Sequence, residues 1–177
     1  EEMESKILKK WKSEDILNKT IENRNNCKNF VFYDGTIYTN AKTGIHHVFA
    51  KTIKDSICKY RTMKGNRVLR KIGLDTHGLP IEVNVEKKLG FKSKADIEKF
   101  GIENFCKECN KETATNIDIV KKVTDQMGQF IDMENPYITC SNEFIESEWW
   151  LIKNIFDQGL IYHGNKVLPY CPRCGTE

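Results

Sequence analysis

Two short apolar runs on either side of one amphipathic pattern constrain the fold of this chain more than any other feature. The first run, Asn29 to Tyr33, ends at the turn pair Asp34-Gly35, and the second run covers Asn66 to Gly73. Between them, from Gly44 to Lys64, apolar residues recur at the spacing of one helix face, and Gly65 suits the helix end. Strand, helix and strand in this order predict a right-handed crossover between parallel strands. The expected fold class is therefore α/β.

The rest of the chain carries further helical patterns. Residues 2–17 have apolar side chains at roughly helical spacing, and residues 18–28 are polar and suit a connection. Later helices are expected over residues 93–100, 102–130 and 142–159, and a short hairpin over residues 160–169. The adjacent Trp149 and Trp150 fall within the last of these helices and are expected to pack in the core.

The composition is that of a globular protein, with 39% hydrophobic and 30% charged residues. No run of about 18 apolar residues occurs, so no transmembrane helix is expected, and the charged start does not resemble a secretory signal. A net charge of +3 neither demands nor excludes nucleic acid. Seven cysteines, an odd number, together with the missing secretion signal, predict reduced thiols in a cytoplasmic protein.

Polar and turn-forming residues follow the predicted strands. Asp34-Gly35 follows the first strand, Gly73 to Glu82 follow the second, and Asn135-Pro136-Tyr137 follow a third segment that reads as a strand. In an α/β protein, ligands bind in the loops that leave the carboxyl ends of parallel strands. The sequence therefore predicts a ligand site in these loops. Asp75 is the carboxylate that directly follows the second strand, and by composition alone it reads as a turn or helix-cap aspartate.

Over nearly its whole length the chain resembles the start of the catalytic domain of isoleucyl-tRNA synthetases, which are class I aminoacyl-tRNA synthetases. The resemblance rests on five stretches: Thr52–Asp55, Tyr60–Gly65, Asp75–Glu82, Asp132–Thr139 and Val167–Cys174. It implies that residues 29–160 form the first half of a class I Rossmann-like domain. Residues 1–28 would form an N-terminal helix and connection. Residues 161–177 would form a short Cys-containing extension, at the start of a zinc-knuckle and editing-insertion connection.

The chain departs from the family where the family's chemistry lies. The family has Asp-Gly-Pro-Pro-Phe after the first strand and then Pro-His-x-Gly-His. Here Thr36 and Ile37 stand at the two prolines. Gly44 stands at the first histidine of the signature and His46 at its glycine. The last histidine of the signature is retained as His47.

By resemblance, the signature opens a helix and meets the phosphates of ATP. Gly44, His46 and His47 would then face ATP, with His46 and His47 as the catalytic candidates. A helix N-terminus favours anions through its free N–H groups and the helix dipole. Removing one donor aimed at developing charge costs on the order of 10²–10³ in rate. The changes at Gly44 and His46 therefore predict weak formation of an adenylate.

By resemblance, Asp75 contacts the α-amino group of the amino acid. A carboxylate suits that role because it pairs with an ammonium that must stay oriented while the substrate carboxylate attacks ATP. The resemblance also places the loop after the first strand and a later histidine at the substrate: Gly35, Thr36, Ile37, Tyr38 and His77. Ile37 is expected to bulge where a ligand should fit.

Cys171 and Cys174 have the spacing of a zinc knuckle. A tetrahedral zinc site needs four ligands, commonly two such pairs. By spacing, Cys106 and Cys109 offer a second pair, which leaves a complete zinc site open. The resemblance places the partner pair outside these 177 residues, so it implies an incomplete half-knuckle.

The reaction implied by resemblance is the ATP-dependent activation of isoleucine and its transfer to tRNA. The family's Lys-Met-Ser-Lys-Ser loop does not occur in the 177 residues. Two hypotheses therefore stand: a synthetase fragment that is inactive alone, or a degenerate paralogue that binds a nucleotide, an amino acid or a protein without catalysis. Half a nucleotide fold would leave an unpaired sheet edge, which invites self-association or a partner strand.

Overall fold

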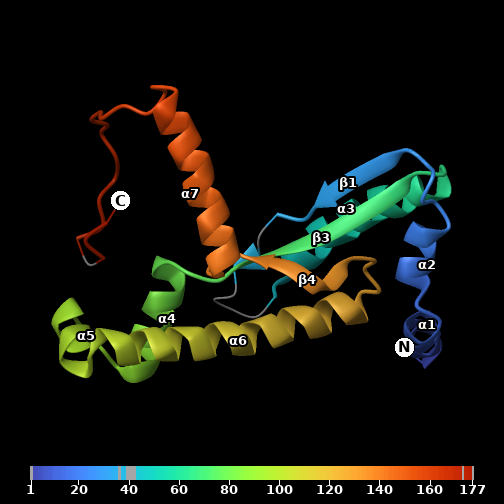
Figure 1. Cartoon of the computed structure of the whole chain (residues 1–177). Helices are drawn as coiled ribbons and strands as arrows, with labels where there is room; N and C mark the ends of the chain where they lie inside the picture. Colours follow the sequence, from blue (N-terminus) through green and yellow to red (C-terminus); the bar gives the residue numbers. More distant parts are fainter. Residues whose placement is uncertain (1, 36, 39–42, 173, 177) are drawn as a thin grey trace.

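The computed structural model describes residues 2–35, 37–38, 43–172 and 174–176. Its helices are α1 (Glu2–Ser13), α2 (Ile16–Glu22), α3 (Ile45–Met63), α4 (Leu79–Leu89), α5 (Lys94–Phe100), α6 (Ile102–Gln126) and α7 (Asn142–Asp157). Its strands are β1 (Asn29–Tyr33), β2 (Ile37–Tyr38), β3 (Arg67–Asp75) and β4 (Asp132–Ile138). Figure 1 shows the sheet with α3 behind it and the long α6 running beneath it.

The sheet is parallel and is organised around β3, which pairs with β1, β2 and β4. β1 runs beside the first half of β3, and the short β2 runs beside its last two residues. The predicted α/β fold is therefore confirmed, including the strand, helix and strand of β1, α3 and β3. Because all four strands are parallel, their carboxyl ends lie toward one edge, which positions the loops after β1, β3 and β4.

The core lies between the sheet and α6. Alternate residues of β3 are buried, as expected for a strand whose two faces differ. Ile72 and Leu74 are fully buried and pack with Ile37, Val120 of α6 and Ile131. The expectation that Ile37 would bulge toward a ligand is wrong, because its side chain is 8% exposed and belongs to this cluster.

The N-terminal region and the tail differ from the sequence-based expectations. The helix predicted over residues 2–17 breaks at Asp15, which adopts a left-handed backbone with φ 49°, and α2 then continues to Glu22. The supposed connection over residues 18–28 is thus partly helical. The hairpin predicted over residues 160–169 is wrong, because this part of the described chain forms no strand.

Two further elements were missed and one was misplaced. α4 begins at Leu79, after Gly78, and has Pro80 in its first turn. Proline is tolerated there because the backbone N–H groups of a first turn have no partner within the helix. β2 lies in the segment expected to be a loop. The Asn135-Pro136-Tyr137 segment lies within β4, and does not follow a strand as expected, because β4 consists of mostly polar residues without an apolar alternation.

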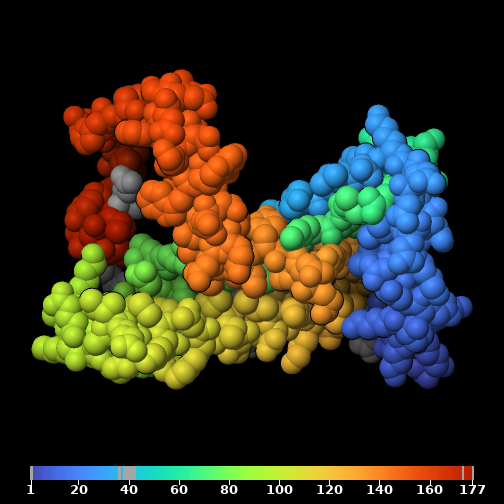
Figure 2. All heavy atoms as spheres, in the orientation of Figure 1, coloured from blue at the N-terminus to red at the C-terminus, as the bar shows by residue number. Residues whose placement is uncertain are grey.

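The helices α3 and α7 expose much of their apolar surface. On α3 the buried side chains are Lys51, Asp55, Cys58 and Thr62, whereas apolar residues such as Phe49 are exposed. The prediction that Trp149 and Trp150 pack in the core is wrong, because they are 65% and 64% exposed. Figure 2 shows α7 and the tail standing apart from the N-terminal half across a wide notch. Among the described residues, none of the helices could span a lipid bilayer.

Candidate functional site

The predicted ligand loops meet at the carboxyl end of β3. Asp75 is the last residue of β3 and is partly exposed. The β2 segment lies beside it, with Tyr38 in register with Asp75 and Ile37 with Leu74. On the other side, Leu74 is in register with Ile138 at the end of β4. The fold thus brings together three segments that are far apart in the sequence.

Thr139, which directly follows β4, connects the residues of this end of the sheet. Its Oγ1 lies 2.9 Å from Nδ1 of His77, 3.5 Å from Oδ1 of Asp75 and 3.1 Å from the backbone N of Thr76, which donates to it. Thr76 in turn accepts a hydrogen bond from the backbone N of Cys140 at 3.1 Å. Sequence reasoning gave Thr139 no role, since no local pattern distinguishes it from other threonines.

Tyr137 links β4 to the end of β1 across the face of β3. Its hydroxyl donates to the backbone O of Asp34 at 2.7 Å, and its ring stacks on Phe144 at the start of α7. The ring crosses Gly73 so closely that a Cβ there would lie 2.0 Å from Cζ of Tyr137. Gly73 is therefore required by a close approach and not by a turn.

Asp34 is a buried anion between two lysines. Its side chain is 1% exposed and lies 3.0 Å from Nζ of Lys51 and 2.6 Å from Nζ of Lys54. Burial by itself raises the pKa of Asp34, but hydrogen bonds and positive charge from Lys54 and Lys51 outweigh it and hold the pKa below its ordinary value. Lys51 also donates to Oε1 of Gln129 at 3.2 Å. This cluster fixes α3 against the loop that follows β1.

The start of α3 carries Gly44, His46 and His47, the residues at the positions of the altered signature. The backbone N of Gly44 donates to Nδ1 of His47 at 3.0 Å, and the rings of His46 and His47 lie 3.9 Å apart. A Cβ on Gly44 would lie 2.7 Å from the His46 ring, so His46 folds back over the glycine. Burial, with positive charge from His46 and Lys51, lowers the pKa of His47 and favours its neutral form. Thr36 and residues 39–42 lie outside the described residues.

A sequence profile of the family described as "tRNA synthetases class I (I, L, M and V)" matches residues 6–177. The chain belongs to this family. It is 47% identical over 175 residues to the isoleucine–tRNA ligase of Clostridium kluyveri, covering 99% of this chain and 17% of that protein. The isoleucine–tRNA ligase of Dehalococcoides mccartyi is 46% identical over 176 residues, with the same coverage.

The class I fold is also seen in a solved structure. The chain matches the crystal structure of a ternary complex of Agrobacterium radiobacter LeuRS with tRNA and LeuAMS. The TM-score is 0.67 at 24% identity, covering 90% of this chain and 18% of that one. The α/β architecture is therefore that of part of a class I synthetase catalytic domain. This chain spans 17% of the length of the curated relatives that it matches. The activity of those full-length proteins can therefore only be proposed for this chain.

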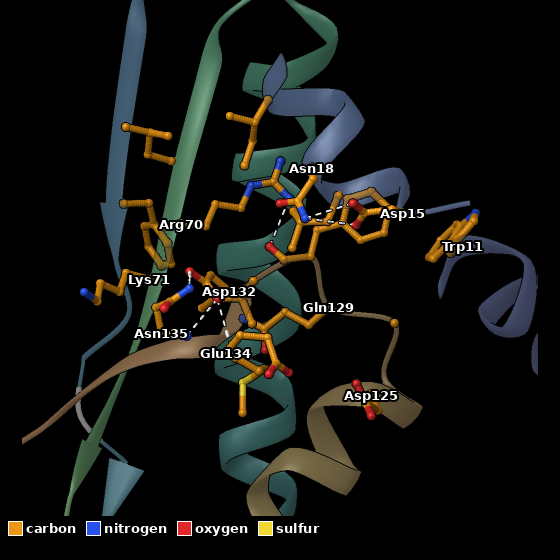
Figure 3. Close-up of a pocket in the computed structure, with 18 of the residues that line it drawn as sticks. Trp11, Asp15, Asn18, Arg70, Lys71, Asp125, Gln129, Asp132, Glu134 and Asn135 are labelled. Atoms are coloured by element: carbon orange, nitrogen blue, oxygen red, sulfur yellow. Dashed lines mark hydrogen bonds between the residues drawn. The ribbon is translucent and has the colours of Figure 1, made fainter. Parts of the chain in front are cut away.

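Two cavities flank the sheet of this class I segment. One, of about 490 Å³, adjoins the Asp75 loop and is lined by Thr76 and His77 together with residues of α4, α5 and α6. A larger one, of about 740 Å³, lies between the N-terminal helices and the sheet, and its lining includes Trp11, Asp15, Asn18 and Arg70 (Figure 3). The larger cavity is lined by Gln129 and Asn135 but not by Asp75, Thr76 or His77, so the smaller cavity is the one connected to the Asp75 loop.

The four cysteines that left a complete zinc site open are Cys106, Cys109, Cys171 and Cys174. Cys106, Cys109 and Cys174 line the same 490 Å³ cavity. Within the described residues, however, no group of three or more Cys, His, Asp or Glu is arranged to hold a metal. Burial and the charge of Glu82 raise the pKa of Cys109 to about 11, so its thiol is protonated in the metal-free chain. The described residues therefore do not arrange Cys106 and Cys109 as a second pair beside Cys171 and Cys174.

Proposed function

We propose that this chain forms the amino-acid- and ATP-binding first half of the catalytic domain of a cytoplasmic isoleucine–tRNA ligase. The observation that carries the proposal is the Asp75 loop, held at the carboxyl end of β3 by Thr139 and flanked by β2. The relatives at 47% and 46% identity, named isoleucine–tRNA ligases, support isoleucine as the amino acid. Within the chain, residues 29–160 form the catalytic part, preceded by residues 1–28 and followed by the extension over residues 161–177.

Each site residue has a role in this proposal. Asp75 pairs with the substrate ammonium, because a fixed carboxylate both neutralises and orients it. His77 lies on the same loop, 2.9 Å from the Thr139 hydroxyl, and helps to hold it. Gly35 and Tyr38 border the amino-acid pocket, since their segment runs beside the end of β3.

ATP binds at the start of α3 in this proposal. The first turn of α3 offers free backbone N–H groups and the positive end of the helix dipole to phosphate oxygens. The neutral His47 uses Nδ1 to accept from Gly44, which leaves its other ring nitrogen for a phosphate. His46 is the second candidate donor. The charge that develops during adenylate formation is met by fewer signature donors than in the family, so the isolated chain binds ligands but is inactive in aminoacylation.

A second function, binding without catalysis in a degenerate paralogue, is favoured by one observation. The His46 ring folds over Gly44 and occupies space beside the backbone where a nucleotide would approach. In this alternative the Asp75 loop still binds an amino acid, while α3 does not stabilise a transition state.

Calorimetric titration of the chain with ATP and with a non-hydrolysable isoleucyl-adenylate analogue tests the proposal. We expect micromolar binding of the analogue, weakened at least roughly tenfold by Asp75→Asn because a charge-assisted pair is lost. The matched control is Asp118→Asn, an exposed residue of α6, which should bind like the wild type. No binding of either ligand, or equal binding by Asp75→Asn, would overturn the proposal. Analogue binding without detectable ATP binding would favour the degenerate paralogue.

A further inference from the structure

Thr139 is a buried hydroxyl at the centre of the proposed amino-acid site. It directly follows β4, its side chain is 7% exposed, and its backbone N donates to O of Leu74 at 3.2 Å. This backbone bond fixes Thr139 beside the last residues of β3. The pairing of β4 with β3 therefore places the Thr139 hydroxyl beside the Asp75 loop.

The Thr139 hydroxyl has more polar neighbours than it can hydrogen-bond at the same time. It carries one proton and two lone pairs. The backbone N of Thr76 can only donate to it, at 3.1 Å, and takes one lone pair. The remaining neighbours are Nδ1 of His77 at 2.9 Å, Oγ1 of Thr76 at 3.3 Å and Oδ1 of Asp75 at 3.5 Å. An ionised carboxylate accepts only, so the direction of the His77 contact decides where the Thr139 proton points.

Two arrangements follow from the His77 tautomer. When Nδ1 of His77 carries a proton, it donates to Oγ1 of Thr139, and the Thr139 proton can turn to Oδ1 of Asp75 or to Oγ1 of Thr76. The ionised carboxylate is the stronger acceptor of the two, so it takes the proton. When Nδ1 is bare, the Thr139 proton points to His77, and Asp75 loses this donor. In the first arrangement the side chains are linked by consecutive hydrogen bonds, from His77 to Thr139 and from Thr139 to Asp75. These bonds hold the Asp75 carboxylate in a single orientation.

We propose that Thr139 is a positioning residue that joins His77 to Asp75 and orients the Asp75 carboxylate toward the substrate ammonium. This inference rests on the proposed function, because Asp75 must receive an amino group for its orientation to matter. Reactive geometry is sensitive to small misplacements, since a shift of about 1 Å can cost on the order of 10²-fold. A hydroxyl that restrains the carboxylate therefore contributes to binding without touching the substrate.

Titration of four proteins with the isoleucyl-adenylate analogue and with ATP alone tests the inference. We expect Thr139→Val to weaken analogue binding roughly tenfold and to leave ATP binding unchanged. Thr139→Ser, which keeps the hydroxyl, should bind within about twofold of the wild type. The matched control is Thr124→Val, because Thr124 is 1% exposed and its hydroxyl has no hydrogen-bond partner among the described residues. Equal weakening by Thr139→Ser, or no weakening by Thr139→Val, would overturn the inference.

A measurement without ligand separates this inference from the proposed function. Nitrogen NMR of His77 in the free chain should report a protonated Nδ1 whose signal changes in Thr139→Val but not in Thr139→Ser or Thr124→Val. In the wild type, the Thr139 hydroxyl proton should exchange slowly and give a cross-peak to the His77 ring, which requires no variant to fold. Absence of that cross-peak overturns the positioning role, whereas its presence in a chain that binds no analogue overturns the proposed function alone.

Discussion

At the scale of single residues, the most consequential feature is a charge buried under α3. Asp34 is 1% exposed and is compensated by Lys51, itself 2% exposed, and by the partly exposed Lys54. Such a cluster contributes little when intact, because desolvation offsets attraction, but removing one partner leaves a buried charge without compensation. The cluster therefore specifies how α3 sits on the sheet, next to the proposed ATP site.

We expect Asp34→Asn to lower the free energy of unfolding by about 3 kcal/mol, because Lys51 loses its buried counter-ion. Urea unfolding followed by circular dichroism measures this. The matched control is Asp157→Asn, whose carboxylate pairs with Lys153 at 2.8 Å on the exposed face of α7. It should cost at most about 1 kcal/mol. Equal effects of the two substitutions would contradict the role given to Asp34.

The lowered pKa of Asp34 also sets a pH dependence. Because the folded pKa is below the unfolded value, the stabilisation is present above the unfolded pKa of about 3.9 and is lost as pH falls through the folded pKa. The difference in unfolding free energy between wild type and Asp34→Asn should therefore be constant from about pH 7 to 5 and shrink below about pH 3.9. Urea titrations at several pH values measure it, and a difference that persists unchanged at low pH would refute the assignment.

Gly73 and Tyr137 should be energetically coupled. Gly73→Ala places a Cβ 2.0 Å from Cζ of Tyr137, so the ring must move and release the backbone O of Asp34. We expect a loss of about 1–3 kcal/mol. In Tyr137→Ala the same Gly73→Ala change should cost less, giving a coupling of at least about 0.5 kcal/mol in a double-mutant cycle. Additive effects would show that the ring does not restrict this site.

At the scale of elements, burial is uneven. β3 contains residues such as Ile72 and Leu74 that are 0% exposed, whereas α7 has no buried residue. α7 is anchored at its start, where Phe144 stacks on Tyr137 and the Ser141 hydroxyl accepts from the backbone N of Phe144 at 3.3 Å. β3, which ends at the proposed site, is therefore tightly packed, whereas α7 is held only at its N-terminal end.

This contrast predicts a gradient of hydrogen exchange. Amides over residues 148–157 of α7 should exchange roughly 100-fold faster than amides of β3, because opening α7 exposes little apolar surface. Mass spectrometry of exchange in the native chain measures this, with α6 as an internal reference since it contributes Val120 to the core. Similar protection in α7 and β3 would contradict the arrangement.

At the scale of the whole molecule, large apolar side chains are exposed on several elements. On α3 Phe49 is 68% exposed, Ile53 48% and Ile57 50%, and on the sheet Tyr33 is 63% exposed. Phe49, Ile53 and Ile57 are spaced four residues apart and so lie on one face of α3, and an exposed apolar face of this kind marks contact with other protein. We therefore expect these faces to bind protein, either a second copy or the remainder of a longer chain.

The isolated chain should associate with itself as its concentration rises. Replacing Ile53 and Ile57 by lysine should shift it toward monomer while changing the free energy of unfolding by no more than about 0.5 kcal/mol, because both side chains are exposed. Sedimentation velocity measures association. Replacing the exposed Thr52 and Ser56 by lysine adds the same charge without removing apolar surface, and should leave association in place. A monomer at every concentration would contradict this expectation.

Much of the chain was determined by local sequence. β1 coincides with the predicted Asn29–Tyr33, and α3 differs from its predicted range by one residue at each end. The helix expected over residues 93–100 forms as α5 with Ser93 as its N-cap, and Asp96 accepts from the backbone N of Ser93 at 2.9 Å. These features depend on periodicity, capping and turn residues within a few positions of each other, so they can be read from the sequence.

Only the tertiary structure decided which surfaces meet. The face of α3 that packs inward is polar, because Asp34 and Arg70 lie beneath it and require partners. β4 forms as a strand because β3 offers it a parallel edge, although its own residues alternate poorly. The contact of Thr139 with Asp75 joins positions 64 residues apart. Local propensity carries no information about such pairings, because they arise only when separate strands are brought to one edge of a sheet.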